Sequence, residues 1–182
     1  VRELSAGRRV LNCFSFTGTF GVCAMKGGAA HVTNVDSSRP ALETAEENYK
    51  LNGLPDCACD NIEGDVFEYL RHCRESGEFF DMVILDPPKF IDSKNALMRG
   101  CRAYKDIALL AFRLLKSGGI LVNFSCSGLM ERALFQKITA DAALDAGREA
   151  LIVRELTQAP DHPVPLSFPE GLYLKGFVNR VC

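Results

Sequence analysis

Apolar runs of strand length alternate with amphipathic segments along most of the chain, and this alternation constrains the fold more than any other feature. The first five runs predict strands near residues 9–13, 31–36, 61–64, 80–86 and 120–124. The run Met82-Val83-Ile84-Leu85 is continuously apolar, which is typical of a strand that helices cover on both faces. Because strands that alternate with helices form a mainly parallel sheet, the sequence predicts an α/β fold.

Helices are predicted in the segments between these strands. Pro40 lies near the first helical position of a segment at 39–51, and Asn52-Gly53 ends that segment with residues suited to positive φ. The other helices are expected up to about residue 26 and at 66–73, 103–115 and 129–146. Two last strands, at 149–156 and 172–181, are separated by a proline-rich loop, which is compatible with an antiparallel pair at one sheet edge.

The composition is that of an ordinary globular domain, and we expect residues 1–182 to form one catalytic unit. Hydrophobic residues make up 47% of the chain and charged residues 24%, and no apolar run is long enough to span a membrane. No secretory signal pattern opens the chain. Since the first residue is Val1 and not Met, we expect a fragment of a longer protein.

The eight cysteines are scattered and form no CxxC pair, and the three histidines do not bracket a cysteine pair at metal-ligand spacing. We therefore expect free thiols in a reducing cytoplasm, and no metal site. The net charge of −2 gives no general argument for a nucleic-acid partner.

Polar or glycine-rich residues follow each of the first five predicted strands. In open α/β sheets, ligands bind in the crevice outside the carboxyl ends of the strands. Five such markers in chain order predict one ligand site there. The markers are 14–21, Asp36-Ser37, Gly64-Asp65, Asp86-Pro87-Pro88-Lys89 and Ser125-Cys126-Ser127.

Three of these markers fit the parts of S-adenosylmethionine (SAM). The turn at 14–21 lacks both GxGxxG and GK[ST], but its two glycines let backbone N–H groups approach a carboxylate. Asp36 lies 18 residues after Gly18, a spacing typical of a ribose-hydroxyl acceptor. Asp65 is a candidate acceptor for the adenine amino group. Each aspartate alone is equally well explained as a helix N-cap.

The segment Asp86-Pro87-Pro88-Lys89-Phe90 predicts a rigid turn, because proline restricts both itself and the residue before it. Such a turn would hold Asp86 at the site rim and project Lys89 and Phe90 outward. Phe90 is then a candidate for stacking on a base and Lys89 for contacting a phosphate. The alternative is that Phe90 packs into the core.

Cys126 indicates the type of reaction. Carbon 5 of a pyrimidine is a poor nucleophile until a group adds at carbon 6, and a cysteine thiolate can add there. We therefore predict Cys126 as the nucleophile beside Asp86, with the site lowering the thiol pKa or deprotonating it on attack. A buried structural cysteine is the alternative.

The stretch 89–116 carries a local excess of five positive charges. Its position predicts that basic side chains of this stretch, Arg102 and Lys105 among them, contact RNA. The alternative is a solvated helix face.

Several long segments resemble the catalytic domain of the bacterial large-subunit ribosomal RNA methyltransferase I family, which makes 5-methylcytosine in 23S ribosomal RNA. They include LNCFSFTGTFGV, VDSSRPALETAEENYKLNGL, DMVILDPPKF, FSCSGLM and HPVPLSFPEGLYLKGF. The resemblance implies a class I SAM-dependent methyltransferase (Rossmann-like) fold, with helices on both faces of a seven-stranded sheet whose last strand is antiparallel. It implies 23S ribosomal RNA as partner, no membrane and no metal.

The resemblance also assigns roles to residues. Cys126 and Asp86 are implied as catalytic. The SAM contacts implied are Phe14, Ser15, Phe16, Thr17, Gly18, Asp36, Ser37, Asp65, Val66 and Asp86. The substrate contacts expected are Pro87, Pro88, Lys89, Phe90, Arg102 and Lys105.

The chain departs from related patterns in two ways. Family members have a PUA-type RNA-binding domain and a linking domain at the N-terminus, which we expect to lie outside this fragment. Another branch of RNA 5-methylcytosine enzymes has a product-releasing cysteine after the strand-four prolines, where this chain has Lys89.

Three other functions stay open on the residues alone. A 5-methyluridine methyltransferase needs the same cysteine, so the thiol cannot distinguish the two bases. A guanine N-methyltransferase shares the Asp-Pro-Pro motif but needs no thiol. A non-catalytic nucleotide-binding domain is the third.

Overall fold

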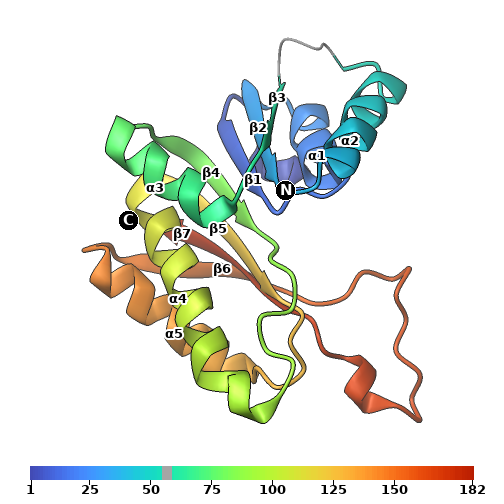
Figure 1. Cartoon of the computed structure of the whole chain (residues 1–182), viewed down its shortest axis with the longest axis vertical. Helices are drawn as coiled ribbons and strands as arrows, with labels where there is room; N and C mark the ends of the chain where they lie inside the picture. The colour runs from blue at the N-terminus through green and yellow to red at the C-terminus, as the bar shows by residue number, and fades with distance from the viewer. Residues whose placement is uncertain (55–58) are drawn as a thin grey trace.

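The computed structural model describes residues 1–54 and 59–182 and contains one seven-stranded sheet in the order β3-β2-β1-β4-β5-β7-β6 (Figure 1). The strands are β1 (Arg9–Cys13), β2 (His31–Asp36), β3 (Cys59–Glu63), β4 (Phe80–Leu85), β5 (Leu115–Ser125), β6 (Ala150–Leu156) and β7 (Lys175–Val181). Neighbouring strands from β3 to β5 are parallel, whereas β7 runs antiparallel to both β5 and β6. The predicted α/β class, seven strands and reversed last strand are confirmed.

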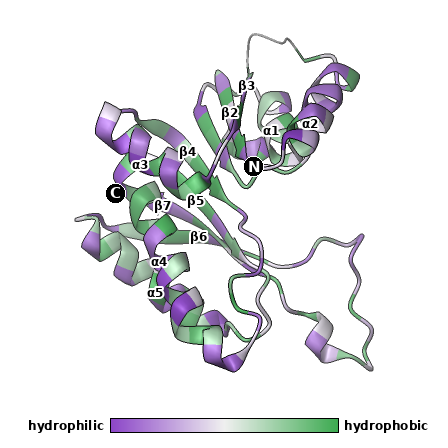
Figure 2. Cartoon of the chain, in the orientation of Figure 1, coloured by the Kyte–Doolittle hydropathy of each residue, from purple (hydrophilic) through white to green (hydrophobic). Residues whose placement is uncertain are grey.

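Helices cover both faces of the sheet (Figure 1). They are α1 (Thr19–Lys26), α2 (Arg39–Leu51), α3 (Val66–Ser76), α4 (Leu97–Leu114) and α5 (Arg132–Asp145), with short 3-10 turns at Arg2–Leu4, Lys94–Ala96 and Pro169–Gly171. Helices α3, α4 and α5 pack over one face, where Leu11, Val83 and Leu121 point, and α1 and α2 lie on the other. Figure 2 shows the apolar strands lying between more polar helices.

The predicted strands β1 and β2 and helix α2 agree with the structure in their bounds. Ser38 caps α2 by accepting a hydrogen bond from the Ala41 amide, with a proline in the first turn as expected. Every residue of β4 is buried except Asp81, as its continuous apolar run predicts.

Several predicted boundaries are wrong: α5 and β7 each begin three residues later than predicted, and the largest differences are at α4 and β5. Helix α4 begins at Leu97, six residues before the predicted start, and β5 begins at Leu115, where the helix was expected to continue. The segment Ser117-Gly118-Gly119 bulges out of the ladder, because Phe80 pairs with Leu115 but Met82 pairs with Ile120.

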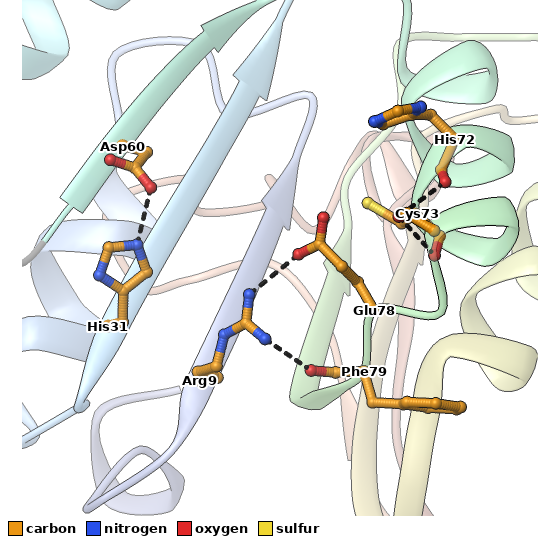
Figure 3. Close-up of polar contacts among 8 residues, drawn as sticks. Arg9, His31, Asp60, His72, Cys73, Glu78 and Phe79 are labelled. Carbon is orange, nitrogen blue, oxygen red and sulfur yellow. Dashed lines mark hydrogen bonds and ion pairs between the residues drawn. The ribbon is translucent and has the colours of Figure 1, made fainter.

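Polar contacts close the amino edge of the sheet (Figure 3). Arg9, at the start of β1, donates to the Glu78 carboxylate at 3.0 Å and to the Phe79 carbonyl at 3.2 Å. His31, at the start of β2, lies 2.9 Å from Asp60 on β3. These contacts join strand starts to one another and leave the carboxyl edge as the place for a ligand.

No disulfide joins the seven cysteines that the structure describes, and the expected thiol of Cys57 lies outside the described residues. Within 1–54 and 59–182, no group of three histidine, cysteine or acidic side chains is placed to hold a metal ion. None of the described helices combines the length and the apolar character needed to cross a membrane.

Replacing Gly18 by alanine is expected to destabilise the protein by about 2–4 kcal/mol, measured by urea unfolding. Gly18 has φ 75°, and an added Cβ would lie 2.8 Å from the Cβ of Ala45 on α2. Gly53→Ala is the matched control, because Gly53 has φ 67° and a Cβ added there would meet nothing within 4 Å. Equal losses of stability in the two variants would contradict close α1–α2 packing as the reason for Gly18.

Candidate active site

A cleft of about 460 Å³ lies at the carboxyl ends of β1, β2, β3 and β4, within the size range of small-molecule sites. Its lining residues are Phe14, Phe16, Asp36, Ser37, Gly64, Asp65, Val66, Asp86, Pro87 and Pro88. The structure thus brings together seven of the ten side chains expected at the cofactor site. Ser15, Thr17 and Gly18 are not among the lining residues.

The Asp36 carboxylate fixes one wall of this cleft. Its two oxygens accept backbone hydrogen bonds from Phe16 at 2.8 Å and from Ser38 at 2.9 Å. Asp36 is therefore not the N-cap of α2, a role that Ser38 fills. Because each carboxylate oxygen has a second lone pair, Asp36 keeps acceptor capacity toward the cleft.

The loop after β1 is strained where it meets Asp36. Phe14 and Phe16 have φ values of 57° and 47°, a region that residues with a Cβ rarely occupy. Between them, the Ser15 hydroxyl is buried without a hydrogen-bond partner among the described residues. Strained backbone and an unsatisfied buried hydroxyl cluster at functional sites, where a ligand compensates for them.

Asp65 has the alternative role that the sequence left open. One of its oxygens accepts from the Glu68 amide at 3.0 Å, which makes Asp65 the N-cap of α3. Its carboxylate still lines the cleft, so capping and ligand binding are compatible.

The two expected glycines of the loop serve helix packing. A Cβ on Gly18 would meet Ala45, and one on Gly21 would overlap the Tyr49 hydroxyl. Neither glycine lines the cleft, and the expectation that they let backbone N–H groups approach a ligand stays a prediction.

Cys126 lies directly after β5, in the wall beside the Asp86-Pro87-Pro88 turn. Its Sγ is 3.9 Å from the Pro87 carbonyl oxygen, and the side chain is half-buried. Pro87 and Pro88 line the first cleft, and Lys89 and Gly128 line a second one. Cys126 itself is among the lining residues of neither cleft, but it is half-buried rather than enclosed in the core, and its neighbours in space line both.

The electrostatic surroundings of this thiol are mixed. Burial and the nearby Asp86 carboxylate raise the pKa of Cys126, while Lys175 and Lys89 oppose that rise. Burial also raises the pKa of Asp86. The prediction that the site lowers the pKa of the Cys126 thiol in the free protein is therefore wrong. The other predicted way to activate the thiol, deprotonation during the attack, stays open.

The second cleft, of about 760 Å³, is bounded by the loops after β4 and β5 and by the segment that enters β7. Its walls carry Lys89, Leu129, Leu172, Tyr173 and Lys175. Tyr173 and Lys175 were not predicted as site residues. The available signal was the antiparallel direction of the last strand, because the start of an antiparallel strand meets the carboxyl ends of its parallel neighbours.

Phe90 does not project outward, and this prediction is wrong. Its ring contacts Phe14, Phe67 and Tyr104, with centroid distances of 6.2, 6.0 and 4.8 Å. The alternative of core packing holds, because these contacts bury more apolar area than an exposed ring would. Lys89 is exposed, as expected.

The basic stretch 89–116 does not form one surface. Lys89 lies at the carboxyl edge, whereas Lys116 pairs with Asp81 of β4 at 2.8 Å. Lys105 pairs with Asp145 at the end of α5, at 2.7 Å. This ion pair offsets the charge of Lys105, whereas Arg102 lies exposed on α4, and contact of either residue with RNA stays a prediction.

Comparisons with known proteins agree with this geometry. A family model described as S-adenosylmethionine-dependent methyltransferase matches residues 1–164. The ribosomal RNA large subunit methyltransferase I of Aeromonas salmonicida is 57% identical over 180 residues, which are 99% of this chain and 46% of that protein. Its counterpart from Photobacterium profundum is 58% identical over 175 residues, covering 96% of this chain and 44% of that protein.

The chain thus spans less than half the length of these curated relatives. Among solved structures, a protein assigned as a methyltransferase and complexed with SAH superposes with a TM-score of 0.86 at 25% identity. The match covers 98% of this chain and 47% of that one.

Replacing Asp36 by alanine is expected to speed hydrogen exchange at the Phe16 and Ser38 amides by about tenfold, measured by NMR. Both amides lose their acceptor in this variant. The Gly64 amide, which donates to the Asp36 backbone carbonyl at 3.0 Å, is the internal control and should not change. Unchanged exchange at Phe16 would show that Asp36 does not hold the strained loop.

Proposed function

The chain belongs to the S-adenosylmethionine-dependent methyltransferase family, and from that premise we propose that it methylates carbon 5 of a cytosine in 23S ribosomal RNA through a covalent bond to Cys126. The observation that carries this proposal is the half-buried Cys126 thiol directly after β5, with its Sγ 3.9 Å from the carbonyl oxygen of Pro87, a residue that lines the first cleft. One cleft has the size and donor set for SAM, and the other is open to a base.

The residues of the first cleft fit SAM. Asp36 has free lone pairs for the ribose hydroxyls, and Asp65 has a free carboxylate oxygen for the adenine amino group. The strained loop is suited to the methionine carboxylate, because Phe14 and Phe16 line the cleft and the unsatisfied Ser15 hydroxyl lies between them, just behind the lining residues. When bound, SAM supplies an electrophilic methyl group.

Cys126 activates the base. Its sulfur forms a bond to carbon 6 as the carbon 5–carbon 6 double bond breaks, and the electron pair makes carbon 5 nucleophilic. That pair forms the bond from carbon 5 to the methyl group that SAM would supply, with the demethylated cofactor as the leaving group. Carbon 5 then loses its proton to a base, the electrons of the carbon–hydrogen bond restore the carbon 5–carbon 6 double bond, and the carbon–sulfur bond breaks to release the Cys126 thiolate. Asp86 is the candidate acid-base residue, because its carboxylate is close enough to Cys126 for its charge to raise the pKa of the thiol.

The second cleft is the proposed entry for the target base. Its side chains combine apolar surface at Leu129 and Leu172, an aromatic ring at Tyr173 and a positive charge at Lys89. A base splayed out of RNA can stack on Tyr173 in place of Phe90, while Lys89 meets a phosphate. Pro87 and Pro88 hold the turn between the two clefts.

The assignment of ribosomal RNA as the substrate rests on the similarity to relatives. Both relatives quoted above are named ribosomal RNA large subunit methyltransferase I, and this supports 23S ribosomal RNA in the cytoplasm as the substrate. The choice of cytosine over uracil rests on the same similarity.

The SAM site predicts a ligand-dependent gain in thermal stability. SAM at a hundredfold excess over Kd is expected to raise Tm by about 5–10 °C. Asp36→Ala should show a smaller rise, whereas Asp141→Ala, on the distant α5 surface, should respond like the wild type. An equal rise with NAD would favour a dinucleotide-binding domain instead.

Cys126→Ala is expected to reduce RNA methylation by about three orders of magnitude while retaining the thermal shift with SAM. RNA containing 5-fluorocytosine should trap a covalent adduct with the wild-type protein, seen as a mass increase, and none with the variant. Cys182→Ala, at the exposed end of the chain, is the control. Full activity in Cys126→Ala would favour a guanine N-methyltransferase, and trapping only by 5-fluorouracil RNA would favour 5-methyluridine formation.

A further inference from the structure

Resting on the proposed function, we propose that Lys175 is the positioning residue that places a positive charge beside Cys126 and favours its thiolate form during attack on the base. Lys175 is the first residue of β7 and stands opposite Ser125, the last residue of β5. Because β7 is antiparallel to β5, its start lies at the same sheet edge as the nucleophile.

A hydrogen bond fixes the Lys175 ammonium in the nucleophile loop. Its Nζ donates to the Ser127 carbonyl at 2.7 Å, one residue beyond Cys126. The carbonyl is held in turn, because the Ser127 hydroxyl is bonded to the Ile91 amide at 3.3 Å and to the Tyr104 hydroxyl at 3.1 Å. The lysine head group therefore cannot swing freely into solvent.

Four groups surround the thiol from the elements packed against it. Asp86 follows β4, Lys89 lies in the next loop, Tyr104 comes from α4 and Lys175 from β7. Asp86 disfavours the thiolate, and the two lysines favour it. Tyr104 remains neutral at ordinary pH, because burial raises its pKa.

Lys175 is better placed than Lys89 to act on the sulfur. Lys89 is exposed, so solvent and salt screen its charge. Lys175 is half-buried at the floor of the second cleft, where a charge acts through a lower dielectric. Burial lowers the pKa of Lys175, and the Cys126 thiolate opposes that fall, so the two groups favour each other's charged forms.

The test is the pH profile of Cys126 alkylation by iodoacetamide, followed on its tryptic peptide by mass spectrometry. It needs neither RNA nor SAM, so it is independent of the proposed function. Lys175→Met is expected to move the profile about one pH unit upward, a tenfold slower reaction at a pH below the thiol pKa. Lys175→Arg should keep the wild-type profile, and Lys89→Met should move it less than Lys175→Met.

Lys175→Gln separates charge from structure. Glutamine keeps a polar N–H donor on a shorter side chain but carries no charge, so the proposal requires it to behave like the methionine variant. A wild-type profile in Lys175→Gln or in Lys175→Met would overturn the proposal, even if methylation were lost. A shifted profile in a protein that does not methylate RNA would overturn the proposed function and leave the role of Lys175 intact.

Discussion

The structure depends on one constraint, the burial of a parallel sheet on both of its faces. Strands β1, β4 and β5 direct mostly apolar side chains toward helices on either side, and the buried Asn12 of β1 and Asn123 of β5 are hydrogen-bonded to other side chains within the protein. The amino edge is closed by contacts such as that of Arg9 with Glu78. Charged and polar groups able to bind a ligand therefore collect at the carboxyl edge, where strand ends from distant parts of the chain meet.

Loops at that edge would be mobile without anchors, and aromatic packing provides them. Tyr104 of α4 contacts Phe90 on one side and Phe135 of α5 on the other, and Phe135 stacks on Phe177 of β7. The ring of Phe90 also contacts Phe14, which joins the loop after β1 to the same aromatic cluster. One connected cluster therefore ties the cofactor loop, the Asp-Pro-Pro turn and the last strand together, which explains why Phe90 is directed inward.

Much of the fold could be predicted, because local signals specify it. The cap at Ser38 and the turn at Asn52-Gly53 define α2, and the apolar run of β4 defines a strand buried on both faces. The early start of α4 could not be predicted, since Gly100 argues locally against a helix. The reason for a glycine at position 100 is tertiary packing, because a Cβ added to Gly100 would lie 2.9 Å from the Phe90 carbonyl oxygen.

The difference between local signals and tertiary contacts also separates the site residues that the sequence predicted from those that it did not. Asp36, Asp65, Asp86 and Cys126 each lie at the carboxyl end of a strand or within two residues of it, so their common location can be deduced from strand order alone. Lys175 and Tyr173 lie at or before the start of a strand, and their place depends on its direction and its neighbour. The ion pair of Lys105 with Asp145 could not be predicted from the sequence either, because it joins two helices that are distant in the chain.

The charges around Cys126 suit a nucleophile that is reactive only when a substrate is present. Burial raises the pKa of both Cys126 and Asp86, so the site resists holding two negative charges at once. A thiol that stays protonated in the free protein is protected from oxidation and alkylation, which require the thiolate. In the proposed mechanism, the opposing charge of Lys175 keeps the free energy of deprotonating the thiol low enough for attack when the base arrives. Burial, Asp86 and Lys175 would then together restrict the thiolate to the moment of attack.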